Sequence, residues 1–276
     1  MKRQISVISK IKHKNYCFLP LSFNSENFSP LSKITSCQIC FPELKIAAAN
    51  YPIILTKKDK KNFKTEVLFS FIKNKNPFIN PSGKWLGGYI PAQLRCIPFT
   101  LVQNEKKTDK FLSFLTESEF VFDKKNENCI PFFKDDLLSN ELSQIMKTID
   151  QIDKSSIELD NALKLISDLD LIVEWPINIR FKDGEKKIEG MYKIDSEKIQ
   201  NLSENDVFKL HKYRGFEIIY SQLISMAKVD NIVNIIKSEN LTSNQAKSLR
   251  EVVIEKQKIE KDREIDDLVK NLISPD

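Results

Sequence analysis

The side chains best suited to chemistry lie within residues 83–101, GKWLGGYIPAQLRCIPFTL. This segment carries an indole, a phenol and a guanidinium at Trp85, Tyr89 and Arg95, and two prolines stiffen its backbone. Arginine binds a carboxylate through two parallel hydrogen bonds, and an indole offers a flat stacking surface. These three residues therefore form a candidate pocket for an anionic or amide-rich ligand.

The same residues are also suited to a structural role. Aromatic side chains with a polar tip usually bury the ring and satisfy the tip with a hydrogen bond. Trp85 and Tyr89 would then pack in the core, and Arg95 would pair with an acid such as Glu43. We favour this interpretation, because the sequence places no matched nucleophile, base or metal cluster beside the segment.

The chain has only two histidines, His13 and His211. His211 could act as a general base if it met Arg95 and a carboxylate, whereas a lone helical histidine is more often packed or solvated. The surroundings of Arg95 should separate the two hypotheses. A pocket shared with His211 or a carboxylate would favour an enzyme, and burial against Glu43 would argue against one.

Cys37 and Cys40 have the CxxC spacing of zinc and redox sites. A structural zinc site needs two further ligands, and the sequence holds neither a second CxxC nor a pair of neighbouring histidines. A thioredoxin-like role needs a βαβ context, which residues 36–41 do not provide. We therefore expect no metal and no cofactor.

Phosphate-binding and hydrolase motifs are absent from the sequence. Of the six glycines, only Gly83, Gly87 and Gly88 form a cluster. We expect them to permit close packing around Trp85 rather than to hold a phosphate.

The five cysteines are an odd number in a chain large enough to fold without cross-links. They therefore predict reduced thiols in a cytoplasmic setting. The N-terminus lacks both the continuous apolar region and the small-residue cleavage site of a signal peptide, which also favours the cytoplasm. No apolar run reaches the roughly 18 residues of a membrane span.

The charge is unevenly distributed along the chain. Residues 1–100 carry 16 basic and 4 acidic side chains, although the net charge of the whole chain is only +5. Such asymmetry can indicate nucleic-acid binding. Part of the excess, however, falls in one lysine-rich loop at residues 57–61, and modules that combine basic and stacking aromatic residues are absent. We do not expect nucleic acid to be a partner.

The first 130 residues favour strands and irregular segments. Short apolar runs at 52–55, 67–72 and 99–102 are broken by turn residues, and only residues 43–50 suggest a short helix, with Pro42 at its start.

Helical spacing takes over after about residue 134. One helix is predicted from the spacing of Leu138, Leu142, Ile145, Ile149 and Ile152, and a second from the capping box Ser155-x-x-Glu158. A hairpin follows, with alternating apolar residues from Ile177 to Ile194 around a turn at Asp183-Gly184. Two more helices are expected, one capped by Ser203 with Gly215 as its stop, and one over residues 216–227.

The predicted fold class is α+β, with a strand-rich N-terminal half packed against C-terminal helices and an inserted β-hairpin. We expect one globular domain over residues 1–235 and a charged helical tail over 236–276. A protein partner or a second copy could bind through that C-terminal helix.

Four ordered blocks resemble the bacterial SapC family. The central block comprises Gly83-Lys84-Trp85, Tyr89-Ile90-Pro91-Ala92, Leu94-Arg95 and Pro98-Phe99. Upstream lie Pro42-Glu43, Ala47-Ala48 and Tyr51-Pro52-Ile53, and downstream lie residues 190–195, then Leu202 and His211, then Ile224-Ser225-Met226. The departures are Arg214, inserted before Gly215, and the long tail.

The resemblance implies a role linked in name to a paracrystalline surface layer, without an agreed catalytic activity. A non-catalytic protein-interaction or envelope-associated role is therefore our leading hypothesis, and surface association is possible by that resemblance. The alternative is an enzyme or enzyme accessory in peptide or glycan modification. Its pocket would surround Arg95 and hold the candidate ligand-binding residues Glu43, Trp85, Tyr89, Arg95 and His211.

Overall fold

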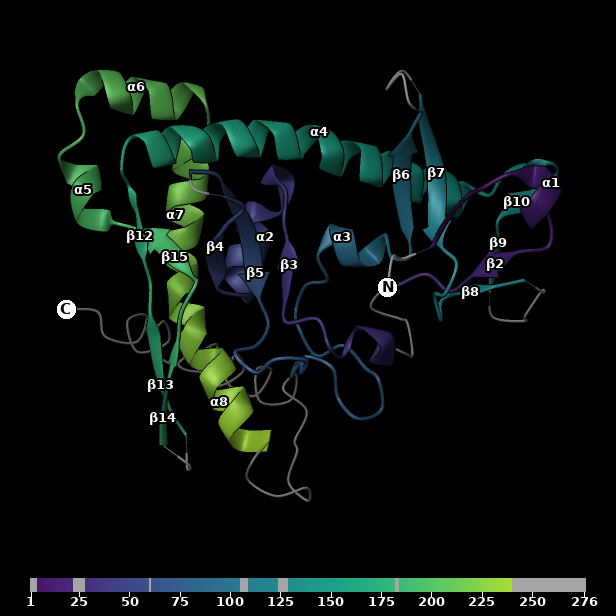
Figure 1. The fold of residues 1–276 in the computed structure, drawn as a ribbon, viewed down its shortest axis with the longest axis horizontal. Helices are drawn as coiled ribbons and strands as arrows, with labels where there is room; N and C mark the ends of the chain where they lie inside the picture. The colour runs from purple at the N-terminus through teal and green to yellow at the C-terminus, as the bar shows by residue number, and fades with distance from the viewer. Residues whose placement is uncertain are drawn as a thin grey trace, which may run out of the picture.

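The computed structural model describes residues 4–21, 28–59, 61–104, 109–123, 129–181 and 184–239. The predicted α+β class is confirmed, because antiparallel sheets and covering helices build the described chain (Figure 1). The long helix α4 (Asn140–Asp168) runs across the five-stranded sheet and the three-stranded sheet that contains β6 and β7. Most of the predicted tail, from residue 240 on, lies outside the described residues.

The main sheet has five antiparallel strands in the order β12-β15-β4-β5-β3. The strand expected at residues 52–55 is β4, which begins at Ile53 and continues to Lys57. The strand expected at 67–72 begins earlier and ends at Leu68. The bounds of the five strands are Ile172–Glu174, Tyr192–Ile194, Ile53–Lys57, Phe63–Leu68 and Ser36–Gln38 in sheet order.

Helix α7 (Gly215–Ser225) is fixed to this sheet by buried polar side chains. Ser225 Oγ accepts the Ile53 amide at 2.8 Å, and Gln222 Oε1 accepts the Ile194 amide at 3.2 Å. Nearby helices are η2 (Phe41–Glu43), α2 (Leu44–Asn50), α5 (Ser196–Gln200), α6 (Glu204–Lys212), η3 (Met226–Lys228) and α8 (Val229–Glu239).

The predicted break between two helices near Ser155 is wrong, because α4 is continuous through this position. No proline or glycine interrupts residues 140–168. Ser155 is buried inside the helix, where its Oγ accepts the Phe41 amide at 2.9 Å instead of capping an N-terminus. The side chain that resembled a cap therefore joins α4 to η2.

A second, smaller core lies at the N-terminal end of α4. It packs Phe18, Phe99, Phe114 and Phe132 against Leu142 of that helix. The strands around it form two sheets of order β1-β7-β6 and β8-β2-β9. Their bounds are Ile5–Val7, Lys110–Leu115, Phe99–Gln103, Val121–Phe122, Cys17–Phe18 and Ile130–Pro131 in that order.

A disulfide joins Cys17 to Cys129 in this smaller unit, with 5.6 Å between the two Cα atoms. The expectation that all five thiols are reduced is therefore wrong for this pair. Chain folding sets their proximity, since 112 positions separate them in the sequence. The other three cysteines are free and buried.

The expected hairpin is present as β13 (Ile177–Phe181) paired with β14 (Gly184–Ile188), and it projects from the main body in Figure 1. The remaining short elements are α1 (Lys10–His13), η1 (Ser29–Leu31), α3 (Ala92–Arg95), β10 (Phe133–Lys134) and β11 (Leu137–Leu138). None of the helices within the described ranges is long and apolar enough to cross a membrane.

Gly215 begins α7 rather than ending the preceding helix, which corrects the prediction. The preceding residue, Arg214, adopts the left-handed conformation at φ 60° that redirects the chain. Its guanidinium bonds Glu217 at 2.7 and 3.0 Å and Glu158 of α4 at 3.3 Å, and it lies 4.2 Å from the ring centroid of Phe41. Arg214 thereby links α7, α4 and η2.

Candidate functional site

Glu43 is a buried carboxylate at the centre of the candidate site, with 5% of its surface exposed. Its Oε1 accepts the Tyr89 hydroxyl at 2.7 Å and the Ala92 amide at 2.6 Å. Its Oε2 accepts the Cys40 amide at 3.2 Å and the Cys40 thiol at 3.0 Å. Four donors thus compensate the carboxylate for the water that it loses on burial.

The short helix η2 positions this carboxylate. Cys40 adopts the N-cap position and Glu43 the third helical position, so that the two residues form a capping box. Pro42 suits this first turn because its missing amide hydrogen would have had no helical partner. The local sequence CFPE therefore turns Glu43 back towards the start of its own helix.

Trp85 and Tyr51 both donate a hydrogen bond to the backbone carbonyl of Tyr89. This oxygen accepts the Trp85 indole hydrogen at 3.1 Å and the hydroxyl of the fully buried Tyr51. The Trp85 ring packs with Phe28, Phe69 and Phe78 at centroid distances of 5.4 to 6.4 Å. The predicted placement of Trp85 in the core is confirmed, and Tyr89 is half-buried.

Gly87 lies where these groups converge. A Cβ atom at this position would lie 2.8 Å from Trp85 Nε1 and would overlap the hydroxyl of Tyr51. At Gly88 a Cβ atom would overlap the side-chain amide of Asn50. Gly87 therefore permits close packing around Trp85, as expected from the sequence, whereas Gly88 is exposed and its close neighbour is Asn50.

Arg95 lies at the end of α3 with its side chain exposed. Its guanidinium carbon is 5.9 Å from the ring centroid of Tyr89, the residue whose hydroxyl binds Glu43. Within the described residues no acidic side chain comes within ion-pair distance of Arg95. The expected Arg95–Glu43 pair is therefore not formed, and a tyrosine hydroxyl binds Glu43 where arginine was predicted.

His211 is exposed on α6, and the structure does not bring it to Arg95. Figure 1 shows α6 above one end of α4 and α3 below the opposite half. The candidate set thus divides into a cluster of Glu43, Trp85, Tyr89 and Arg95, and a separate His211.

Burial and the nearby carboxylate shape the acid–base properties of the cluster. Desolvation, followed by the negative charge of Glu43, raises the pKa of Tyr89 above its ordinary value. The same two causes raise the pKa of Cys40 to about 12 and also raise the pKa of Cys37. These thiols are therefore protonated near neutral pH, which opposes both metal binding and nucleophilic attack.

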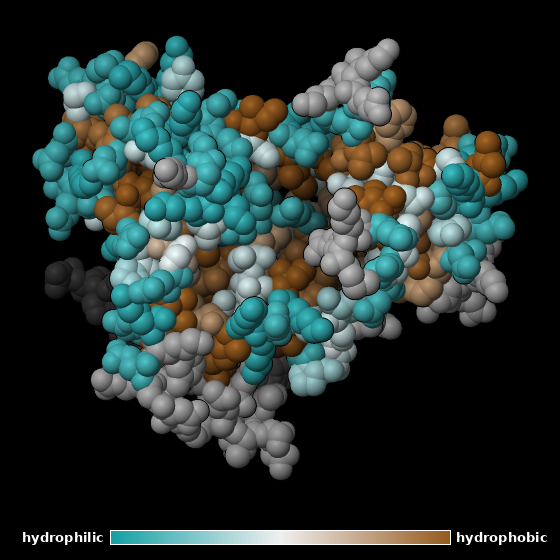
Figure 2. All heavy atoms as spheres, in the orientation of Figure 1, coloured by the Kyte–Doolittle hydropathy of each residue, from teal (hydrophilic) through white to brown (hydrophobic). Residues whose placement is uncertain are grey.

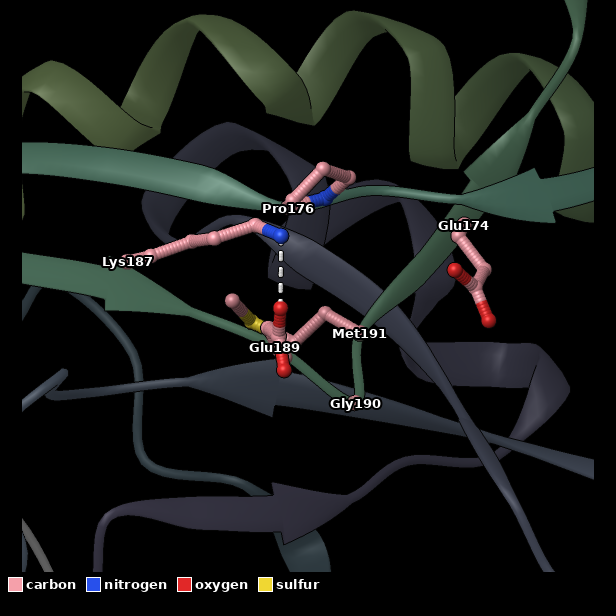
Figure 3. Close-up of a pocket in the computed structure, with 6 residues that line it drawn as sticks. All are labelled: Glu174, Pro176, Lys187, Glu189, Gly190 and Met191. Carbon is pink, nitrogen blue, oxygen red and sulfur yellow. Dashed lines mark ion pairs between the residues drawn. The ribbon is translucent and has the colours of Figure 1, made fainter.

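A pocket of about 240 Å³ lies away from this cluster, at the base of the β13–β14 hairpin (Figure 3). Lys187 and Glu189 form an ion pair at 2.6 Å beside it, and Glu174 lies on the opposite side. The lining residues are Glu174, Pro176, Lys187, Glu189, Gly190 and Met191. None of the five predicted site residues is among them. Across the described ranges, no group of three His, Cys, Asp or Glu side chains is arranged to hold a metal ion.

Glu43, Trp85 and Tyr89 come from two of the sequence blocks noted above, and hydrogen bonds join those blocks in space. The model of the SapC family matches residues 9–232, most of the chain. The chain belongs to the SapC family. No curated protein and no solved structure matches it.

Two contributors to this SapC site were not predicted as functional residues, namely Tyr51 and Cys40. Tyr51 was part of the upstream block, so its bulk and its hydroxyl were the available signal. Cys40 was considered only with Cys37, whereas its partner is Glu43, three residues later. The spacing of a capping box could have indicated that contact.

Proposed function

We propose that this SapC-family chain is a non-catalytic protein that binds another protein, in surface-layer or cell-envelope biology. The observation that carries the proposal is an exposed apolar face on α7. The surface-layer setting rests on the family resemblance alone.

The apolar face of α7 comprises Phe216, Tyr220 and Ile224, spaced four residues apart and hence on one side of the helix. Phe216 is partly buried against the main core, and Tyr220 and Ile224 supply the exposed part of the face. Tyr220 is 52% exposed and Ile224 is 69% exposed. The Phe216 and Tyr220 rings stack at a centroid distance of 5.8 Å with 18° between their planes. A solvent-facing helix surface usually carries charged or polar residues instead.

The neighbouring helix α6 and the residue that follows it carry further exposed aromatic side chains. Phe208 is 66% exposed, and Tyr213, just after α6, is 51% exposed. Aromatic residues are enriched at the centres of protein interfaces because they bury a large area with few rotatable bonds. This composition suits a protein partner better than a small polar ligand.

The contacts of residues 83–101 with Glu43 agree with this proposal. Glu43, Trp85 and Tyr89 direct their polar atoms at one another inside the protein. Their contacts position η2 against the segment around α3 and serve the fold. The apolar face of α7 makes no contribution to this hydrogen-bonded cluster and is exposed at Tyr220 and Ile224.

Site-specific photo-cross-linking in cells tests the proposal. A photoreactive amino acid at Ile224 should cross-link one discrete partner protein, and Tyr220→Asp should remove that product. The same amino acid at Ile157, which is 66% exposed on α4, is the matched control. An identical pattern from both positions, or no protein product from Ile224, would refute the proposed interface.

One observation favours the enzyme alternative, namely that the exposed Arg95 guanidinium lies beside the half-buried Tyr89 ring. It is tested with mixtures of peptides and glycans, by mass spectrometry of the products. An activity that Arg95→Ala removes without lowering the melting temperature would establish this alternative, and absence of turnover by the wild-type chain would count against it.

A further inference from the structure

The two most exposed large apolar side chains among the described residues are Ile11 and Leu137, at 97% and 73%. They belong to different elements, α1 and β11, which are far apart in the sequence. Figure 1 places α1 and β10, the partner strand of β11, together at one end of the molecule. We call this end, formed by residues 10–14 and 134–137, the tip.

An ion pair joins the two parts of the tip, because Lys10 Nζ lies 2.8 Å from Asp136 Oδ2. The residues that follow these two, Ile11 and Leu137, therefore belong to segments that lie side by side, and both are exposed. The side chain of His13, on the same short helix as Ile11, is buried against Tyr16 and Phe114 at ring distances of 4.8 and 5.3 Å. The buried His13 side chain thus fixes α1 to the smaller core. The apolar side chains of the tip, Ile11 and Leu137, are left exposed to solvent.

The charge around the two apolar side chains is mainly positive. Exposed lysines stand at positions 10, 12, 14 and 134, against aspartates at 135 and 136. Lys10 is the ion-pair partner of Asp136, and the charge of Lys14 also lowers the pKa of that aspartate. Figure 2 shows apolar atoms among hydrophilic ones at this end of the molecule.

We propose that the tip binds the surface of an anionic lipid bilayer, with Ile11 and Leu137 inserted among the lipids and the lysines at the headgroups. Apolar side chains gain free energy by leaving water for the acyl boundary, and each lysine near an anionic surface adds electrostatic attraction. Lysine also suits this position because its long apolar stem can lie along the boundary while the ammonium stays hydrated.

A second copy of the chain is a poorer occupant. Like charges on two facing tips would repel. Two apolar side chains also provide far less surface than the roughly 800 Å² per partner of a stable dimer. The bilayer interaction does not depend on the α7 face, which comprises other residues, so the two proposals can fail separately.

Co-sedimentation of the full chain with lipid vesicles tests the proposal. Vesicles that contain phosphatidylglycerol should bind the protein, and vesicles of phosphatidylcholine alone should bind it much more weakly. Ile11→Ser or Leu137→Ser should each weaken binding about tenfold. The pair Lys12→Gln and Lys14→Gln should weaken it about thirtyfold. Because these side chains are exposed, the variants should keep the wild-type melting temperature.

The controls are Ile157→Ser and Ile224→Ser, two equally drastic changes at exposed positions on α4 and α7. Both should leave vesicle binding unchanged. The proposal is overturned if the wild-type chain ignores phosphatidylglycerol vesicles, or if the tip variants bind as the controls do. It is equally overturned if analytical ultracentrifugation shows a dimer that Ile11→Ser dissociates while no variant alters vesicle binding.

Discussion

Tyr89 donates its hydroxyl hydrogen to Oε1 of Glu43 across 46 positions of sequence, at a distance of 2.7 Å. The Ala92 amide reaches the same oxygen at 2.6 Å, so the carboxylate holds both the turn before α3 and the start of that helix. Glu43 thus accepts hydrogen bonds from two separate segments, whose donors would otherwise bond to water. Removing this acceptor costs more free energy than the hydrogen bonds contribute to stability, because the buried donors are then left without a partner.

Glu43→Gln should therefore lower the free energy of unfolding by about 3 kcal/mol, although the two side chains have nearly the same shape. The glutamine amide group would point two hydrogens at groups that are themselves donors. Urea unfolding followed by circular dichroism measures the change. The matched control is Glu174→Gln, because Glu174 accepts a tyrosine hydroxyl on the surface, from Tyr192 at 3.4 Å. A loss under about 0.5 kcal/mol is expected there, and equal losses for the two variants would contradict the role of Glu43.

Gly87→Ala should destabilise the protein by about 2 kcal/mol, because the new methyl group overlaps the Tyr51 hydroxyl in a packed region. Thermal unfolding provides the measurement. Tyr51→Phe removes the overlapped oxygen, so the double variant should be more stable than the sum of the two single losses predicts. Strict additivity would show that the two positions do not meet. Gly190→Ala is a useful control, since that site has open space around it and only backbone strain at φ 84°.

The sequence predicted the fold best where one local signal controls one element. Ser203 caps α6 through the Asp206 amide as its spacing suggested, and the alternation that begins at Ile177 gives the expected hairpin. Gly184, however, pairs with Phe181 in the ladder instead of lying in the turn that was predicted at Asp183-Gly184. The packing of Trp85 could also be predicted, because its residue type already favours a buried ring.

Tertiary contacts decided the features that the sequence could not predict. Ser155 fits a capping box by spacing, but the Phe41 amide, 114 positions away, takes its hydroxyl as acceptor inside a longer helix. Arg95 was assigned to Glu43 by charge, yet four nearby donors satisfy that carboxylate without any cation. Local spacing alone does not give either outcome, because Phe41 is distant from Ser155 in the sequence, and Tyr89 and Ala92 are distant from Glu43.

The thiols should react in a pattern set by burial. Desolvation raises the pKa of Cys40 to about 12 and that of Cys96 to about 11. Both thiols are therefore almost entirely protonated at pH 8, and the reactive thiolate form is rare. A chromogenic disulfide reagent should therefore detect no fast thiol in the native protein. Denaturant should release three thiols, and denaturant after reduction should release five, because Cys17 and Cys129 are paired. Five thiols without a reductant would contradict the disulfide, and rapid native reaction would contradict the raised pKa values.

The stability of the smaller core should depend on pH through His13. Its Nδ1 accepts the Ser9 amide at 3.1 Å, so Nε2 carries the proton and faces Ser6 Oγ at 3.3 Å. Burial, assisted by the charge of Lys12, lowers the pKa of His13 from its ordinary value of 6.5. Below that value the unfolded chain binds a proton that the folded chain resists, so the contribution to stability is complete above pH 6.5 and falls as the pH decreases.

The test compares the free energies of unfolding of the wild type and His13→Gln from about pH 7.5 to about pH 5.5. The advantage of the wild type should shrink towards low pH, because glutamine does not titrate. A constant difference between wild type and His13→Gln across this range would show that His13 takes up its proton equally well in the folded and unfolded chain. In that case the buried contacts with Tyr16 and Phe114 do not disfavour the charged ring.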